Sequence, residues 1–402
     1  MDNAQVVRRR DIRLVVGGTA HFFLAGVAFN VYAVVAVAIR ADLNLTGAQM
    51  GLLMSIASIT YAAMQIPVGL LCLRVNKGLL LVGSALVMAV GALMFSLLRS
   101  YPGLLVSRAV TGIAAGFSVP AISNLLSEGM SEKRLPVGMA VFGSGWSVGA
   151  ALPFVVLSPV LAAVGWRSTM GVVAGFGAVM TLLILFSLTG TVPPARRFSG
   201  APRWNPRALG ALLTNRGAIW LILILTTTLA VQIGLVTWIP AFLQSGRMSV
   251  TVLVTMIPVV LGLSAGTASI TGGAIGARFG KFPVVAVSMI GCVIVPPLFI
   301  FATSVPTAFV LMVLVGWSSM FWWGSGMSML PTLVRKEHTG AAMGVINCLA
   351  WVLGGFPSPW VFGILLDATG TYSFGFLFVG LIGVAGAVGA LSWHRELRSA
   401  SH

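Results

Sequence analysis

The sequence predicts an all-α membrane protein with twelve transmembrane helices in two pseudo-symmetric six-helix bundles. Three observations predict this fold class: few charged residues, a series of long apolar segments, and a repeat that relates the two halves of the chain. Of the 402 residues, 58% are hydrophobic and only 8% are charged, whereas a soluble domain carries about 25% charged residues. So few charges cannot cover a water-soluble protein of this length, and we expect lipid to surround most of the chain.

Twelve apolar segments are long enough to cross a bilayer as helices, which requires roughly 20 residues. Transmembrane β-strands would instead be short segments of alternating polarity. The first segment is longer than the about 7–15 apolar residues of a signal-peptide core, so we expect it to span the membrane. The predicted helices lie near 14–39, 48–71, 78–98, 103–126, 136–160, 167–189, 217–243, 250–275, 282–302, 307–333, 341–366 and 373–393.

The basic residues are distributed unevenly among the loops. With the N-terminus inside, 19 of the 24 Lys and Arg residues fall in inner segments and 4 in outer loops, which leaves Arg108 within a span. This bias predicts that both termini are cytoplasmic. The net charge of +16 then reflects membrane topology, so we expect contact with anionic lipid and no binding of nucleic acid.

A polar, arginine-rich stretch without acidic residues divides the chain into two halves. The predicted domains are an N-terminal six-helix bundle (1–190), a cytoplasmic linker (191–215) and a C-terminal six-helix bundle (216–402).

The two halves carry matching residues at an offset of 204 or 205 positions. The loop from Gly69 to Lys77 recurs as Gly273 to Lys281, with an arginine in the same place, and Trp146 recurs as Trp351. Two bundles made from one duplicated unit enclose a cavity at their interface, which is where transporters bind their substrates.

Two local motifs agree with this arrangement. The loop after the second span reads Gly-Leu-Leu-Cys-Leu-Arg-Val-Asn-Lys, and the fourth span contains Arg108-Ala-Val-Thr-Gly-Ile-Ala-Ala-Gly. In these motifs the chain resembles the major facilitator superfamily, whose loop signature is Gly-x-Leu-x-Asp-Arg-x-Gly-Arg/Lys, although Leu73 and Asn76 replace the usual Asp and Gly. The resemblance implies a monomeric secondary transporter of the bacterial inner membrane that works by alternating access. The family's drug–proton antiporters have a proline where this chain has Ala150.

Ionisable side chains inside the predicted spans are restricted to Arg108 and His21, because all eight acidic residues fall at termini, in loops or at span ends. Most cation carriers place a carboxylate inside the membrane, so its absence from the predicted spans argues against a cationic substrate. Arg108 therefore predicts a small anionic substrate, an organic acid or an inorganic oxyanion, held by the guanidinium fork. Alternatively, Arg108 bonds carbonyls of a neighbouring helix or reaches the outer headgroups. His21 is a candidate second donor or carrier of a coupling proton, or a neutral histidine bonded to a backbone carbonyl.

Uncharged polar and aromatic residues within the spans complete the predicted substrate-binding set. Amides inside a membrane must find partners within the bundle, so most of these residues face inward, for packing or for substrate contact. They are Asn30, Tyr32, Tyr61, Gln65, Trp146, Gln232, Trp238, Trp322, Trp323, Asn347 and Trp351.

Charged residues of the inner loops predict a gate. We expect Arg74 to pair with Glu128 or Glu132, and Arg278 to pair with Glu337, when the inner face is closed. Alternatively, they are solvated loop charges, since an exposed ion pair contributes only about 0–1 kcal/mol.

The sequence contains no nucleophile–base pair, phosphate-binding loop or cluster of metal ligands, so we expect no enzyme activity, cofactor or metal. The leading hypothesis is an anion transporter, with protons as a candidate coupling ion. The alternatives are an efflux carrier for an apolar drug or metabolite, and a non-transporting receptor on a transporter fold.

Overall fold

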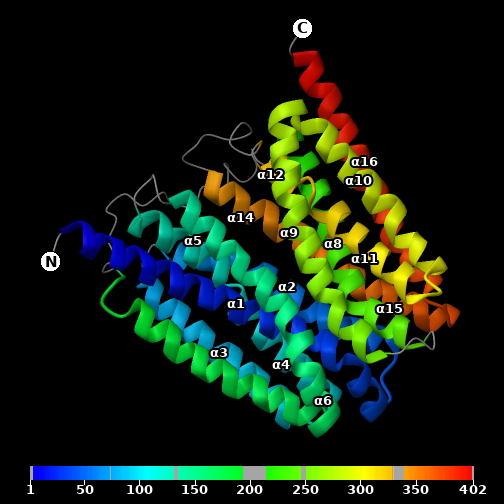
Figure 1. Cartoon of the computed structure of the whole chain (residues 1–402), viewed down its shortest axis with the longest axis horizontal. Coiled ribbons are helices and arrows are strands. Elements are labelled where there is room, and N and C mark those ends of the chain that lie inside the picture. The colour runs from blue at the N-terminus through cyan, green and yellow to red at the C-terminus, as the bar shows by residue number, and fades with distance from the viewer. Residues whose placement is uncertain are drawn as a thin grey trace. The chain divides into compact units, whose positions relative to one another are not determined.

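The computed structural model shows helices joined by short loops, and no strand, in the residues that it describes, which are 3–72, 74–130, 135–192, 214–245, 250–327, 329 and 339–400 (Figure 1). The first half of the chain forms α1 (Asn3–Leu43), α2 (Gly47–Leu71), α3 (Lys77–Leu97), α4 (Tyr101–Ala115), α5 (Ser118–Gly129) and α6 (Leu135–Leu188). The second half forms α8 (Arg216–Ser245), α9 (Val250–Phe279), α10 (Lys281–Leu298), α11 (Val305–Met320), α12 (Trp323–Met327), α14 (Thr339–Ala350), α15 (Pro357–Thr369) and α16 (Ser373–Ala400). Two short segments join them, a 3-10 turn at Phe299–Phe301 and a π-helical turn at Trp351–Gly355.

Eleven helices in the described part of the chain are long and apolar enough to cross a membrane. One of them, Val141–Leu188, includes two of the predicted spans. Its backbone leaves the helical region at Gly165, with φ 75° and ψ 170°. Only glycine adopts this conformation without steric cost, so Gly165 separates the two helical arms of α6.

Local residues explain where several helices begin. The Asn76 side chain accepts hydrogen bonds from the backbone N–H groups of Gly78 and Leu79 and so caps α3. Ser100 caps α4 in the same way, and Pro102 stands in the first turn, where its missing N–H is not needed. The two loops that the sequence predicts, one before and one after α3, therefore end at Asn76 and Ser100.

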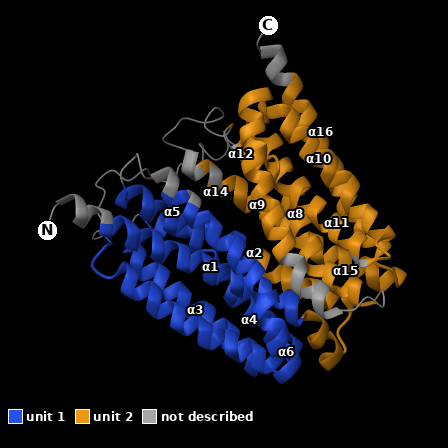
Figure 2. Cartoon of the chain, in the orientation of Figure 1, with its two compact units in different colours: residues 1–35, 60–204 blue, residues 36–59, 205–402 orange. Residues whose placement is uncertain are grey.

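Contacts divide the chain into two compact units, one containing 1–35 and 60–204 and the other containing 36–59 and 205–402 (Figure 2). In unit 1, α3 packs against α4 and α6; in unit 2, α10 packs against α11 and α16. Corresponding pairs of predicted spans are thus neighbours in both units. The end of α1 and the first half of α2 belong to unit 2, although they precede most of unit 1 in the sequence.

Glycine allows equally close helix contact in both units. A Cβ atom on Gly149 would overlap the carbonyl oxygen of Phe23, and a Cβ on Gly354 would overlap the carbonyl oxygen of Thr226. Gly149 and Gly354 are among the positions that repeat at an offset of 205. Small residues that let two backbones approach are the usual basis of helix packing in membranes.

Candidate functional site

Arg108 lies in the middle of α4 and is buried, with 2% of its surface exposed. Its Nη1 and Nη2 atoms donate hydrogen bonds to the carbonyl oxygens of Ala28 and Phe29 in α1, each at 3.1 Å. The guanidinium carbon also lies 5.6 Å from the centre of the Phe29 ring and 5.3 Å from that of Tyr32. Backbone carbonyls and aromatic faces thus solvate the charge, as one of the two alternatives from the sequence expected.

Aromatic rings extend this environment away from the arginine. The Phe29 ring centre lies 6.1 Å from that of Tyr61 and 5.7 Å from that of Trp146, and the last two rings are 6.5 Å apart. Gln65 hydrogen-bonds the Tyr61 side chain and donates to the carbonyl oxygen of Gly116 at 3.4 Å. We call Arg108, Phe29, Tyr32, Tyr61, Gln65 and Trp146 the arginine–aromatic cluster.

The cluster contains five of the predicted substrate residues and one, Phe29, that the sequence analysis missed. Phe29 precedes Tyr32 by three positions and so lies on the same face of α1, which was the available signal. Asn30, by contrast, donates to the carbonyl oxygen of Gly26 in its own helix. Its described bond is therefore local to α1.

His21 is fully buried between two serines. Its Nε2 lies 2.7 Å from Ser84 Oγ, and its Nδ1 lies 3.2 Å from Ser118 Oγ. Ser84 donates its own hydroxyl proton to the carbonyl oxygen of Leu81, so it accepts from Nε2–H while Ser118 donates to Nδ1. One neutral tautomer satisfies all three groups. The described partners of His21 thus lie on α3 and α5, and they are serine hydroxyls instead of the backbone carbonyl considered from the sequence.

The predicted residues of unit 2 lie mostly in packed surroundings. Trp238 is fully buried, donates from Nε1 to the carbonyl oxygen of Pro359 at 2.9 Å, and stacks on Phe362 with ring centres 5.3 Å apart. Trp322 is also fully buried and contacts Trp323 edge to face. The remaining predicted residues of this unit are Trp351, which is buried, and Gln232 and Asn347, which are half-buried.

The predicted inner gate is only partly within the described residues, because Glu132 and Glu337 lie outside them. Glu128 forms an ion pair with Lys77 at 2.7 Å, and Arg74 is exposed. The Arg278 guanidinium lies over the ring of Phe279, 5.2 Å from its centre. In this structure Lys77, which the sequence identified only as a motif residue, is therefore the partner of Glu128, and the remaining gate pairs stay a prediction.

No group of three or more potential metal ligands occurs in the part of the chain that the structure describes. The arginine–aromatic cluster instead contains a buried guanidinium, tyrosine and amide donors, and aromatic faces. Such a combination binds an anion that also has an apolar body.

Residues 19–359 match the model of the Major Facilitator Superfamily. The chain is 24% identical to a probable sulfoacetate transporter of Cupriavidus necator, over 92% of this chain and 90% of that protein. It is also 24% identical to a hexuronate transporter of Bacillus subtilis, over 93% of each. Among solved structures, a bacterial homologue of the human lysosomal transporter Spinster, in an inward-facing and occupied conformation, has a similar fold. Its TM-score is 0.80 at 16% identity, over 95% of this chain and 96% of that one.

Proposed function

Because the chain belongs to the Major Facilitator Superfamily and its relatives are transporters instead of enzymes, we propose that it moves a small organic anion across the membrane by alternating access. Sulfoacetate and hexuronates, the solutes named for two relatives, both carry a carboxylate at neutral pH. The buried Arg108 guanidinium is the single observation that carries the proposal to this chain.

In the proposed mechanism, Arg108 exchanges one set of hydrogen-bond acceptors for another. Its two bonds to the carbonyls of Ala28 and Phe29 keep the guanidinium solvated when no substrate is present. A carboxylate gives shorter and stronger bonds than a carbonyl and fits the guanidinium fork with two parallel N–H groups. The substrate therefore replaces a neutral acceptor by a charged one, and the rings of Phe29 and Tyr32 contact its apolar part.

The proposed orientation follows the distribution of basic residues. With 19 of 24 Lys and Arg residues on one side, both termini lie in the cytoplasm of a bacterial cell and the protein resides in the inner membrane. Protons are the candidate coupling ion. Since both ring nitrogens of His21 are bonded to serines, a proton carried by His21 requires one of these bonds to be rearranged.

The apolar-efflux alternative draws on one observation, the contact of Phe29, Tyr61 and Trp146 in the arginine–aromatic cluster. Such a surface also binds an uncharged aromatic molecule. The two functions differ in their dependence on the charge of Arg108, which only an anionic substrate needs.

The test is uptake of radiolabelled sulfoacetate and glucuronate into proteoliposomes containing the full chain, the Arg108→Lys variant or the Arg108→Ala variant. Lysine keeps the charge but not the fork, so we expect uptake to fall at least about tenfold in Arg108→Lys and further in Arg108→Ala. Arg167→Ala is the matched control, because Arg167 also bonds a backbone carbonyl, that of Leu98, and lies over the Trp166 ring.

Undiminished uptake in Arg108→Ala would contradict an anion site at this arginine. Transport restricted to uncharged aromatic compounds, with the same rate in all variants, would favour the efflux alternative. A protein that binds these solutes without moving them would favour the receptor alternative. Size-exclusion profiles of each variant separate a loss of uptake from a loss of folding.

A further inference from the structure

A cavity of about 310 Å³ lies within unit 2, where the end of α1, the end of α8 and the turn before α16 meet. Its lining consists of Val37, Arg40, Ala241, Gln244, Ser245 and Tyr372. The volume is at the lower end of the range for small-molecule sites, about 300–1,000 Å³. None of these residues belongs to the arginine–aromatic cluster, so the cavity is a separate feature of the fold.

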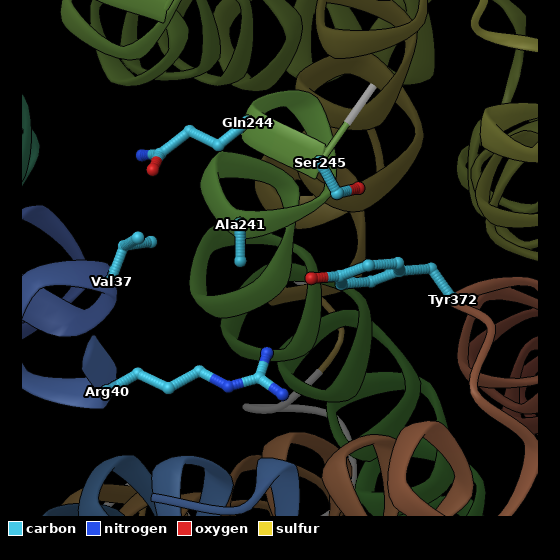
Figure 3. Close-up of a pocket in the computed structure, with 6 residues that line it drawn as sticks. All are labelled: Val37, Arg40, Ala241, Gln244, Ser245 and Tyr372. Atoms are coloured by element: carbon cyan, nitrogen blue, oxygen red, sulfur yellow. The ribbon is translucent and has the colours of Figure 1, made fainter. Parts of the chain in front are cut away.

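The polar lining residues are rich in hydrogen-bond donors. Figure 3 shows the Arg40 guanidinium and the Tyr372 hydroxyl turned toward each other, with Gln244 on the other side of the cavity. A guanidinium, a phenol, an alcohol and an amide all present N–H or O–H groups. Among the lining residues that the structure describes there is no carboxylate, and Arg40 is the one that carries a formal charge.

Among the described residues, Arg40 has a hydrogen-bond partner but no counter-ion. Its side chain hydrogen-bonds the Tyr372 hydroxyl, which also bonds Ser245. The geometry of the described residues gives Lys77 and Glu128 as an ion pair and none that includes Arg40. A phenol oxygen accepts a hydrogen bond from the guanidinium but does not neutralise it, so a positive charge remains at the cavity wall.

The Tyr372 hydroxyl stays protonated at neutral pH. Burial raises its pKa above the ordinary value, and the nearby Arg40 and the hydrogen bonds with Arg40 and Ser245 only partly oppose this effect. The phenol oxygen accepts from Arg40, and because Ser245 donates its own proton to the carbonyl oxygen of Phe242, the phenol proton is donated to Ser245. Tyr372 thus holds the Arg40 guanidinium in place, and the other N–H groups of this guanidinium are the charged donors on this side of the cavity.

We propose that this cavity binds the oxyanion group of a small acid, a carboxylate, sulfonate or phosphate, as a second anion site that shares no residue with the arginine–aromatic cluster. Arg40 supplies the charge and its N–H donors, the Tyr372 hydroxyl holds the guanidinium in place, and Gln244 supplies a neutral donor on the opposite side. This proposal rests on the proposed function in one respect only, namely that the bound anion is the transported one. A lipid phosphate offers the same chemistry, because Arg40 stands near the end of a membrane-spanning helix.

The experiment measures the reaction of individual arginines with phenylglyoxal by peptide mass spectrometry, using the full chain in phosphatidylcholine nanodiscs. Sulfoacetate, glucuronate or inorganic phosphate is titrated in at constant ionic strength. We expect at least one of these anions to slow the modification of Arg40 in a saturable way. Arg99, an exposed arginine at the end of another helix, reports non-specific effects in the same digest.

Two variants test the geometry. In Gln244→Leu, which removes one neutral donor, we expect the half-protecting anion concentration to rise about fivefold. In Tyr372→Phe we expect a similar rise, while Arg108→Ala should leave the protection of Arg40 unchanged. This readout does not depend on transport, so a failure of the Arg108 proposal and a failure of this one are distinguishable.

A modification rate of Arg40 that no anion changes, or that changes only in parallel with that of Arg99, would overturn the proposal. A second preparation, in nanodiscs that contain phosphatidylglycerol, distinguishes the sources of the oxyanion. If this lipid alone slows the reaction of Arg40 and free anions do not, the occupant is a lipid headgroup; if free anions protect in pure phosphatidylcholine, the occupant is a solute.

Discussion

Replacing Asp367 should loosen the first turn of α2. Asp367 stands near the end of α15, and its carboxylate accepts hydrogen bonds from the backbone N–H groups of Gly47 at 2.6 Å and Ala48 at 2.7 Å. The first N–H groups of a helix have no partner within the helix, and a negative charge there also favours the helix dipole. Asp367 therefore caps α2 although it is more than 300 positions away in the sequence.

The cap is worth about 1–2 kcal/mol at the first turn of α2. A single N-cap typically contributes about 1 kcal/mol, and charged hydrogen bonds contribute about 1.5–3 kcal/mol each. Asp367 is exposed, so water competes for these bonds and the lower part of the combined range applies. A loss of 1–2 kcal/mol corresponds to about a 5- to 30-fold increase in local opening.

Hydrogen exchange followed by mass spectrometry on peptides covering 44–52 measures this opening. We expect exchange of the Gly47 and Ala48 amides to accelerate about 5- to 30-fold in Asp367→Ala and less in Asp367→Asn, whose amide oxygen still accepts one bond. The effect should stay local. Further along α2, glycine packing holds the helices together, since a Cβ on Gly51 would overlap the carbonyl oxygen of Pro359 in α15.

Asp42→Asn is the matched control, because it removes the same charge near the end of α1, whereas the described bonds of both capped amides go to Asp367. Equal exchange in Asp367→Ala and the unaltered protein would refute the capping argument. Equal acceleration in Asp42→Asn would show that general electrostatics, and not the two hydrogen bonds, protects the amides.

Two further predictions concern packing and pH. Gly149→Val should lower the melting temperature or prevent folding, since the added Cβ would overlap a carbonyl oxygen of α1. Gly143→Ala, with open space around the new methyl group, should leave the melting temperature within a few degrees of the unaltered protein. Thermal unfolding of both variants tests this, and equal melting temperatures would contradict the packing argument. Burial raises the pKa of the Cys72 thiol from 9.0 to about 11, and the thiolate is the reactive form. The rate at which iodoacetamide labels Cys72 should therefore be low at pH 7 and should still rise about tenfold per pH unit above pH 9, where the labelling rate of a free thiol levels off. A plateau of the rate near pH 9 would show that burial does not raise this pKa.

The positions of the helices were largely predictable from the sequence. Apolar length alone located the spans, and the non-helical Gly165 lies between the predicted segments 136–160 and 167–189. Lipid exposure explains this success, because every spanning segment must be apolar over a length that the bilayer sets. The grouping of 36–59 with unit 2 had no counterpart in the sequence, since it depends on contacts between distant helices.

The sequence predicted most residues of the candidate site but not what those residues contact. The sequence identified Arg108, Tyr32, Tyr61, Gln65 and Trp146 because polar and aromatic side chains stand out in an apolar span. It left open whether the arginine bonds a substrate or a neighbouring helix, and the structure shows bonds to α1. Sequence alone cannot reveal such partners, because a backbone carbonyl has no signature in the residue type.

The sequence by itself determined that this protein spans a membrane, since apolar length and the near absence of charge are additive properties of composition. It also identified Arg108 and His21 as the ionisable groups inside the predicted spans. Only the tertiary structure decided what these and other charged groups touch: serines for His21, carbonyls for Arg108, Tyr372 for Arg40, and the start of α2 for Asp367. The physical reason is that each contact joins residues far apart in the chain, so it depends on how the helices pack.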